Sequence, residues 1–380
     1  MIQIPVEPQI TDFLHKKASK YGIPLNGTFE LTPLCNMDCR MCYIKMSTKQ
    51  QKAIAPLRSA QEWIHLGKSA KEQGMLYLLL TGGEPFMRTD MQEILRGLHK
   101  LGLVISINSN ATLIDEKVID WLKETPPIRI NITMYGASDT TYEKLCRNPK
   151  GFTQVTRAIE LLRNAGISVK INCSVTPYNA KDLDKIFEYC KSEGLIVQAT
   201  SYMFPPLRKN VEMIGINDRF TPEDAAYYAA RIAMLYNGKD AFLKQMIEKK
   251  RNKIPDIPEE DCLEIEGEGI RCRAGKSCFW ITWNGQFLPC GMLTDKNSLN
   301  VFEVGFEEAW RDVRKRVSEI CMPAKCTVCE LKDECKVCAA MVYTENGSFL
   351  KEPEYRCRMT QAYYHQCKRL EEEIRGQKIK

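Results

Sequence analysis

Short β-rich runs alternate with helical segments from Phe29 to about residue 206. This alternation is typical of βα units whose strands form a parallel sheet, and it predicts an α/β fold. The sequence predicts six strands, at Phe29 to Leu34, Leu76 to Thr81, Val104 to Asn108, Ile128 to Thr133, Val169 to Val175 and Ile196 to Tyr202.

Local signals predict where the helices between these strands begin and end. Ser59-Ala60-Gln61-Glu62 reads as a capping box that opens a helix ended by Gly74. Asp90-Met91-Gln92-Glu93 is expected to open a second helix, which ends at Gly102. Two more helices are expected to end at Gly166 and Gly194.

One helix shows its buried face directly. Apolar residues recur at i, i+3, i+4 and i+7, namely Leu183, Ile186, Phe187 and Cys190. These side chains are expected to face the sheet, so Cys190 is predicted to be a core residue.

Composition limits the possible classes of protein. The chain has 380 residues, 44% hydrophobic and 27% charged, enough for two or three globular domains. Its apolar runs are too short to cross a bilayer, and no signal peptide opens it. The net charge of +6 is spread along the chain, which predicts neither a nucleic-acid nor a membrane partner. Seventeen cysteines favour metal binding or catalysis in a reducing, cytoplasmic compartment.

Three cysteines, Cys35, Cys39 and Cys42, follow the first predicted strand with the spacing C-x3-C-x2-C. A [4Fe–4S] cluster normally takes four cysteine ligands, so three thiolates leave one iron able to bind another molecule. A zinc site and simple burial of the cysteines are the alternatives. In parallel barrels the carboxyl ends of strands carry the active site, and the triad is expected at such an end.

The triad resembles the cluster motif of the radical S-adenosylmethionine (SAM) enzymes. This resemblance implies a partial (β/α)6 barrel in which the amino and carboxylate groups of SAM bind the open iron. It further implies that the reduced cluster cleaves SAM and releases a 5′-deoxyadenosyl radical.

The resemblance extends to segments that would bind SAM. Thr81-Gly82-Gly83-Glu84-Pro85 is similar to the segment that holds the methionine amino group, and Ile107 to Thr112 is similar to a ribose-binding segment in which Ala111 replaces a common glycine. A plain turn and an Asx-turn are the respective alternatives. Asn131, Thr133, Asn172 and Ser174 recur at period two, which predicts a ligand or a hydrogen-bond network. The residue before the third cysteine is often aromatic in this family, whereas here it is Met41, so adenine contact passes to Met41 or Tyr43. The candidate cofactor-binding residues are Met41, Tyr43, Gly82, Gly83, Glu84, Pro85, Asn108, Ser109, Asn110, Asn172 and Ser174.

A second cysteine array occupies the C-terminal third of the chain. A hairpin with Asn284-Gly285 at its turn is predicted before Cys290, and a C-x2-C-x5-C-x2-C segment follows. The array resembles the SPASM extension of radical SAM proteins, which binds two auxiliary [4Fe–4S] clusters. The resemblance implies one cluster held by Cys272, Cys278, Cys290 and Cys338, and another held by Cys326, Cys329, Cys335 and Cys357. Cys262 and Cys321 are alternatives to Cys278, and zinc ribbons are the rival type of site.

These features predict a domain organisation. Residues 1–28 form an N-terminal extension, 29–214 the partial barrel, 215–261 a helical linker and 262–380 a small SPASM domain. In the linker, Thr221 is expected to cap a helix that begins at Pro222, and residues 254–258 read as a connecting segment. The mixed charges of residues 368–375 predict a solvated helix.

The family resemblance implies a radical SAM enzyme with three [4Fe–4S] clusters and SAM as cofactors. The first hypothesis is modification of a ribosomally made peptide by a crosslink or by residue oxidation. Oxidation of a small molecule or tetrapyrrole is the alternative, followed by a non-catalytic electron carrier. Sulfatase maturation ranks low, because Gly291 stands where those enzymes carry an aspartate. Expected partners are the substrate, a reductant such as flavodoxin or ferredoxin, and a separate leader-peptide-binding protein, since 28 residues before Phe29 are too few for such a domain. No acid or base is assigned, and core or surface roles are preferred for Tyr135, Tyr202 and Asp295.

Overall fold

A computed structural model describes residues 8–210, 212–250, 269–294 and 297–377. Six parallel strands form the centre of the fold in the order β6-β5-β4-β3-β2-β1. Their bounds are β1 Asn26–Glu30, β2 Tyr77–Thr81, β3 Val104–Ser109, β4 Arg129–Thr133, β5 Val169–Ser174 and β6 Ile196–Thr200. Sequential strands are neighbours throughout, as in a barrel built from βα units.

The sheet continues beyond the predicted six strands. β7 (Cys278–Ile281) pairs in parallel with β1, and β8 (Phe287–Leu288) pairs antiparallel with β7, so the sheet has eight strands within the described residues. Between them Gly285 has φ +94°, and the predicted hairpin turn is confirmed. The C-terminal cysteine-rich part of the chain is thereby attached directly to the edge of the barrel.

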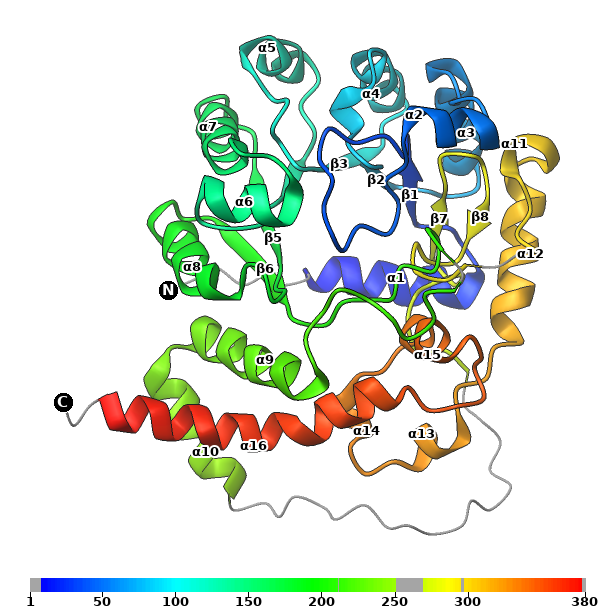
Figure 1. The fold of residues 1–380 in the computed structure, drawn as a ribbon. Coiled ribbons are helices and arrows are strands. Elements are labelled where there is room, and N and C mark those ends of the chain that lie inside the picture. Colours follow the sequence, from blue (N-terminus) through cyan, green and yellow to red (C-terminus); the bar gives the residue numbers. More distant parts are fainter. Residues whose placement is uncertain (1–7, 211, 251–268, 295–296, 378–380) are drawn as a thin grey trace.

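Helices form an arc on the outer side of the sheet (Figure 1). They are α2 Thr48–Ile54, α3 Ala60–Glu72, α4 Met91–Lys100, α5 Glu116–Glu124, α6 Asp139–Cys146, α7 Gly151–Asn164 and α8 Leu183–Ser192, with short 3₁₀ turns η1 Pro85–Met87 and η2 Ala180–Asp182. The periodic face of α8 is buried as predicted, including Cys190. α1 Gln9–Tyr21 precedes the barrel.

The first predicted strand is wrong in its bounds. β1 begins at Asn26 and ends at Glu30, whereas the prediction began at Phe29 and ran to Leu34. Residues 26–30 pair with β2 on one side and with β7 on the other, so partners distant in sequence determine where the strand lies. The buried side chains that suggested a longer strand, such as Leu31, belong to the loop that follows it. The other five strands are confirmed to within one or two residues.

Two of the predicted helix caps are confirmed, at Ser59 and Thr221, and one, at Asp90, is wrong. The capping box of Ser59 and Glu62 is present, with both side chains bonded to the backbone. Asp90 precedes α4 but does not cap it, because its carboxylate accepts hydrogen bonds from Arg88 at 2.8 and 2.6 Å. The Arg88 guanidinium therefore binds the Asp90 carboxylate, which the local sequence pattern had predicted to cap the helix. Thr221 caps α9 as predicted, with its hydroxyl accepting from the Asp224 amide.

Residues 222–250 and 324–377 lie below the barrel in Figure 1. α9 (Pro222–Asn237) and α16 (Glu354–Gln377) run side by side, and α10 (Lys239–Lys250) completes their apolar cluster. The predicted helix over residues 368–375 lies within α16, where Leu370 and Ile374 are buried in this cluster. Shorter helices carry the cysteine-rich region: α11 Val301–Val304, α12 Phe306–Ser318, α13 Ala324–Val328, α14 Lys332–Cys335 and α15 Ala339–Asn346.

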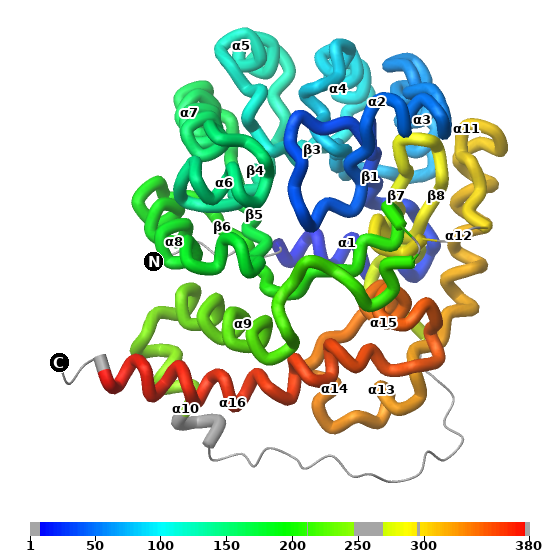
Figure 2. The backbone as a smooth tube through the Cα atoms, in the orientation of Figure 1, coloured from blue at the N-terminus to red at the C-terminus, as the bar shows by residue number. Residues whose placement is uncertain are grey.

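The segment between β6 and α9 connects the two halves. It passes between the ends of the barrel strands and α15 (Figure 2), and the Gly215 amide donates to the Thr344 carbonyl at 2.9 Å. None of the described helices has the length and apolar character needed to cross a bilayer. Cys262, Asp295 and the connecting segment 254–258 lie outside the described residues.

Candidate cofactor and cluster sites

The cysteine triad lies at the carboxyl ends of the barrel strands, as predicted. Cys35, Cys39 and Cys42 follow β1 and line a cavity of about 250 Å³. The ends of four further strands contribute to the same cavity, with mostly polar or glycine residues: Thr81 at the end of β2 and Gly82 and Gly83 after it, Asn108 and Ser109 at the end of β3 and Asn110 after it, Thr133 on β4 and Ser174 on β5.

Gly82 and Gly83 are required by the backbone of the triad loop. The Gly83 amide donates to the Thr32 carbonyl at 2.7 Å, and the Glu84 amide donates to the Leu34 carbonyl at 2.8 Å. A Cβ on Gly83 would lie 2.3 Å from the Leu34 oxygen, and one on Gly82 would lie 2.6 Å from the Thr32 oxygen. The two glycines therefore allow two segments of the chain, residues 32–34 and 82–84, to approach closely, and they also line the cavity.

Glu84 holds three loops together from behind the cavity. Its fully buried carboxylate accepts from the Ser109 hydroxyl at 2.8 Å and from the Asn110 amide at 2.7 Å. The Asn110 side chain in turn donates to the Asn36 side chain at 2.9 Å, next to Cys35. Burial raises the pKa of Glu84 to about 7, although the hydrogen bonds to its oxygens oppose this shift.

The backbone at Ala111 has a conformation that glycine adopts more easily than other residues. Its φ is +62°, in the left-handed region that favours glycine, and its side chain is fully buried. This backbone geometry lets the Ala111 amide donate to the Ser109 hydroxyl at 2.8 Å and turns the chain away from β3.

Most of the predicted cofactor-binding residues line the cavity. Met41, Tyr43, Gly82, Gly83, Asn108, Ser109, Asn110 and Ser174 do so, whereas Glu84, Pro85 and Asn172 are not among its lining residues. Tyr135 and Met203, which were not predicted as cofactor contacts, line it as well. Asn108 also accepts from Asn131 at 2.9 Å, so both a ligand-facing position and a hydrogen-bond network are present there.

The triad cysteines are buried or half-buried, and two of their sulfurs accept hydrogen bonds from backbone amides. The Met37 amide donates to Cys35 Sγ at 3.4 Å, and the Lys45 amide donates to Cys42 Sγ at 3.3 Å. Burial raises the pKa of the Cys35 thiol to about 12 and raises the pKa of the Cys42 thiol as well. These thiols line one cavity, and backbone amides donate to two of the sulfurs. Such donors stabilise thiolates that burial alone would keep protonated, so the arrangement suits ligation of an iron–sulfur cluster.

The first set of C-terminal cysteines converges beside β7. Cys278 interacts electrostatically with Cys272 and Cys290, and Cys290 interacts with Cys338. Burial is the main cause of the raised pKa of Cys278, about 11, and it also raises the pKa of Cys290 and Cys338. Cys321 is exposed and forms an isolated bridge with Gly269. The structure thus brings together the four cysteines expected for one auxiliary cluster.

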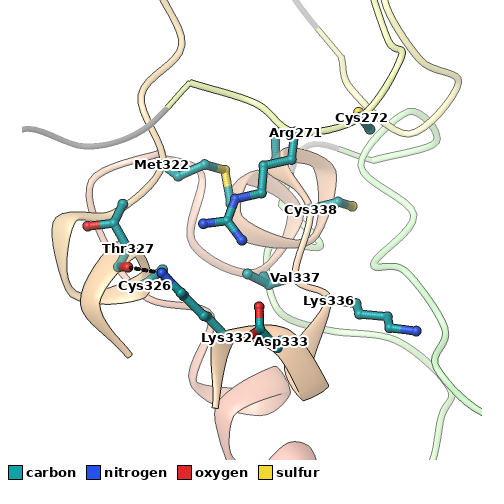
Figure 3. A pocket seen from close by; sticks show the side chains of 11 residues that line it. Arg271, Cys272, Met322, Cys326, Thr327, Lys332, Asp333, Lys336, Val337 and Cys338 are labelled. Atoms are coloured by element: carbon teal, nitrogen blue, oxygen red, sulfur yellow. Dashed lines mark hydrogen bonds between the residues drawn. The ribbon is translucent and has the colours of Figure 1, made fainter. Parts of the chain in front are cut away.

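The second set surrounds a cavity of about 620 Å³. All four expected ligands line it: Cys326, Cys329, Cys335 and Cys357. A neighbouring cavity of about 380 Å³, shown in Figure 3, is lined by Cys272, Cys326 and Cys338, one or more from each set. In the part of the chain that the structure describes, no cysteine forms a disulfide. Cys326 lines both cavities, so the two sets of cysteines lie next to one another, and cluster binding by either set stays a prediction.

Glu30 and Arg208 form a buried ion pair near the cavity, which the sequence did not predict. Glu30, at the end of β1, is fully buried and accepts from Arg208 at 2.7 and 2.6 Å and from the Trp280 indole at 3.1 Å. Arg208 also donates to the Gly291 carbonyl at 3.3 Å and lies over the Tyr43 ring. The signal available in the sequence was a glutamate between the apolar residues Phe29 and Leu31, but no neighbouring residue indicated its partners.

A second buried pair accounts for Tyr202. Its hydroxyl donates to Glu345 at 2.6 Å, and Glu345 also accepts from Arg219 at 2.7 and 2.8 Å. These bonds join the segment after β6 to α15. The expected structural role for Tyr202 matches this position.

Comparison with known proteins agrees with this geometry. A family model described as "Radical SAM superfamily" matches residues 29–190. The AdoMet-dependent heme synthase of Methanosarcina barkeri is 26% identical over 344 residues, which span 86% of this chain and 94% of that protein. The subtilosin biosynthesis protein AlbA of Bacillus subtilis is 24% identical over 320 residues, covering 81% of this chain and 66% of AlbA.

Solved structures share the fold. SuiB of Streptococcus suis bound to precursor peptide SuiA has a TM-score of 0.65 at 16% identity, covering 90% of this chain and 79% of SuiB. Native anSMEcpe with bound AdoMet has a TM-score of 0.65 at 18% identity, covering 94% of this chain and all of that one. The partial barrel, the triad at its strand ends and the family match together lead to one conclusion. Residues 29–190 of this chain form a radical SAM domain.

Proposed function

We propose that this enzyme abstracts a hydrogen atom from a residue of a ribosomally made peptide, leading to a thioether or other crosslink or to oxidation of that residue. The observation that carries the proposal is a groove of about 530 Å³ beside the triad cavity. Tyr43 and Ile44 line both the groove and the cavity. A substrate in the groove would therefore lie against the place where the cofactor binds.

The chemistry of the groove suits a peptide. Its walls combine apolar and polar groups: apolar side chains come from Ile44, Met46, Ile54, Leu207, Ile214, Trp283, Leu288 and Tyr343, and the hairpin adds the hydroxyl and amide groups of Thr282, Asn284 and Gln286. Apolar walls with a few placed hydrogen-bonding groups are typical of sites that bind side chains and backbone together.

Charge favours a peptide over an acidic tetrapyrrole. Among the described residues that line the groove, Arg208 is the one charged side chain. Its guanidinium already pairs with both oxygens of Glu30, so its charge is balanced within the protein. A ligand with several carboxylates would find no unbalanced cation in this lining.

The residues present fit the cofactors of the family. Cys35, Cys39 and Cys42 would hold the [4Fe–4S] cluster, and the strand ends that line the cavity would hold SAM. When bound, these groups supply a hydrogen-abstracting 5′-deoxyadenosyl radical by one-electron cleavage of the sulfonium. The chain's own contribution is to bury this site and to place the groove next to it.

Two auxiliary clusters complete the proposed cofactor set. Cys272, Cys278, Cys290 and Cys338 would hold one, and Cys326, Cys329, Cys335 and Cys357 the other. Cys290 interacts electrostatically with Tyr43 and Arg208, so the first of these sites would border the groove. We further propose a cytoplasmic setting with a flavodoxin or ferredoxin as reductant, and a separate protein that binds the leader peptide.

Oxidation of a tetrapyrrole or another small molecule is the second candidate. It is favoured by the relative from Methanosarcina barkeri, named an AdoMet-dependent heme synthase, because the alignment spans 94% of that protein. The groove lining described above argues against this candidate, and the two are separable by experiment.

The test begins with anaerobic reconstitution. Three clusters correspond to about twelve irons per chain, and replacing Cys35, Cys39 and Cys42 together with alanine should leave about eight and abolish 5′-deoxyadenosine formation. The wild type is then incubated with deuterated cysteine-containing precursor peptides, or separately with a propionate-bearing iron tetrapyrrole. Deuterium in 5′-deoxyadenosine and the mass of the product identify the substrate.

A groove variant with a matched control sharpens this test. Ile214 is 42% exposed and lines the groove, whereas Ile216 is 57% exposed and does not. Ile214→Glu should slow peptide modification without reducing cleavage of SAM in the absence of peptide, and Ile216→Glu should change neither. Deuterium transfer from the tetrapyrrole alone would refute the peptide proposal. Failure to cleave SAM would indicate an electron carrier.

A further inference from the structure

Two cations lie on the same face of the sheet as the cavity. Thr133 on β4 and Ser174 on β5 line the cavity. Side chains alternate between the two faces of a strand, so residues four positions earlier share this face. These residues are Arg129 at the start of β4 and Lys170 near the start of β5. Each lies about 13 Å along its strand from the cavity lining, at about 3.3 Å per residue.

Strand pairing brings the two cations together. Lys170 is the register partner of Asn131, which is two residues after Arg129. The cations are therefore diagonal neighbours, with Cα atoms about 8 Å apart for a strand spacing of about 4.8 Å. Both side chains are half-buried. Burial and, next, the charge of Arg129 lower the pKa of Lys170, so this proximity costs free energy in the absence of a counter-charge.

Neutral amides are the hydrogen-bond partners of these cations. Arg129 Nε donates to the Asn131 side chain at 3.0 Å, and the Lys170 ammonium donates to the side chain of Gln198 on β6. Asn131 donates in turn to Asn108, which lines the cavity, at 2.9 Å. A guanidinium has five N–H donors and an ammonium has three. Within the part of the chain that the structure describes, most of these donors have no acceptor and neither cation forms an ion pair.

The two cations lie near an open edge of the sheet. β6 is an edge strand of the described sheet, and Gln198 on it is exposed. β4 and β5 lie on the other side of the barrel from β7 and β8 (Figure 2), whose hairpin lines the groove proposed for the peptide. A ligand that reaches from this groove across the cavity to Lys170 has to be extended, as a peptide is.

We propose that Arg129 and Lys170 form a binding site for one carboxylate of the substrate, an acidic side chain of the peptide. The identity of the ligand rests on the proposed function, whereas the site itself does not. A guanidinium matches the geometry of a carboxylate, and the ammonium adds a second charge-assisted hydrogen bond. The bound carboxylate would also supply the missing counter-charge. The groove lining itself still offers no unbalanced cation to a ligand with several carboxylates.

The site is tested first with glutarate, whose carboxylates resemble a glutamate side chain, and with glutaramide as the uncharged analogue. The reconstituted enzyme is unfolded by heat under anaerobic conditions at constant ionic strength, because a ligand that binds the folded protein raises the melting temperature. Arg129→Met/Lys170→Met is compared with Lys68→Met/Lys191→Met. The control removes two exposed cations from the outer helices α3 and α8, so both double variants lose the same charge.

Glutarate, but not glutaramide, should raise the melting temperature of the wild type and of the control. Arg129→Met/Lys170→Met should need about tenfold or more glutarate for the same shift, because it lacks the charged hydrogen-bond donors. Lys170→Arg keeps the charge and should retain most of the response. An equal response in the two double variants would overturn the site.

The single variant Lys170→Met separates binding from a structural role. Without glutarate it should melt at the wild-type temperature or above, since it removes the repulsion from Arg129. A lower melting temperature would indicate that Lys170 stabilises the fold, and would count against the proposal. If Arg129→Met/Lys170→Met does not fold, the glutarate response of Lys170→Met decides by the same criterion.

The source of the carboxylate is tested on a precursor peptide that the wild type modifies. Each acidic residue of the peptide is replaced in turn by its amide. One replacement should raise KM in the wild type with little change in kcat, and should have no further effect in Arg129→Met/Lys170→Met. A glutarate response without any such residue would overturn the assignment to a peptide side chain. If the wild type modifies no peptide, the proposed function fails while the glutarate result stands.

Discussion

Removing Arg208 should destabilise the protein far more than removing an exposed arginine. Arg208 and Glu30 form a bidentate pair in which the two side chains are 10% and 0% exposed. Burial opposes the charge on Arg208, but the neighbouring Glu30 carboxylate more than compensates, and the pKa of Arg208 is raised. In Arg208→Met, Glu30 keeps the Trp280 indole at 3.1 Å as its remaining described donor.

The expected loss follows from the cost of an unpaired buried charge. Breaking a buried pair by removing one partner costs about 3 to 5 kcal/mol, because the other charge stays desolvated. The double variant Glu30→Gln/Arg208→Met removes the remaining charge and should recover part of this loss. Arg157→Met is the control, since Arg157 and Glu116 are 64% and 60% exposed and such surface pairs contribute about 1 kcal/mol or less.

The assay is urea unfolding of the reconstituted proteins under anaerobic conditions, followed by far-ultraviolet circular dichroism. The free energy of unfolding of Arg208→Met should fall by several times the change seen in Arg157→Met. The reasoning would be refuted if Arg208→Met lost no more than the control. It would also be refuted if the double variant were as unstable as Arg208→Met.

Three further predictions concern the loops around the triad. Gly83→Ala should reduce iron content from about twelve to about eight per chain, because the added Cβ would lie 2.3 Å from the Leu34 oxygen; an iron assay with full retention would contradict this. The raised pKa of Glu84, about 7 against a usual 4.5, means that the folded protein keeps a proton that the unfolded chain loses. Its contribution to stability is therefore complete below about pH 4.5 and is lost as pH rises through 7, and urea unfolding at several pH values should show a flatter profile for Glu84→Gln. Ala111→Gly should leave the free energy of unfolding unchanged or raise it by about 1 kcal/mol, because glycine adopts the left-handed backbone conformation of this position without the steric cost that alanine has. A clear decrease in the free energy of unfolding, measured by calorimetry, would contradict this explanation.

Local patterns in the sequence were sufficient for the elements of the barrel. The box of Ser59 and Glu62, the buried face of α8 and the turn at Gly285 all depend on residues within one or two turns of each other. The triad spacing and the glycines after β2 likewise predicted a site at the strand ends, and a cavity lined by these residues lies there. Such features are visible in sequence because short-range spacing is set by the period of the element itself.

What the tertiary structure decided depends on contacts between distant segments. The start of β1 follows from its pairing with both β2 and β7, and Asp90 leaves its cap position because Arg88 reaches it. Glu30 pairs with Arg208, and the Asp38 amide donates to the Cys146 carbonyl, across more than a hundred residues of chain. The spacing of residues within one helix or strand does not predict these long-range contacts. They arise because a parallel sheet brings separate strand ends to one edge, where buried charges and thiols must find partners.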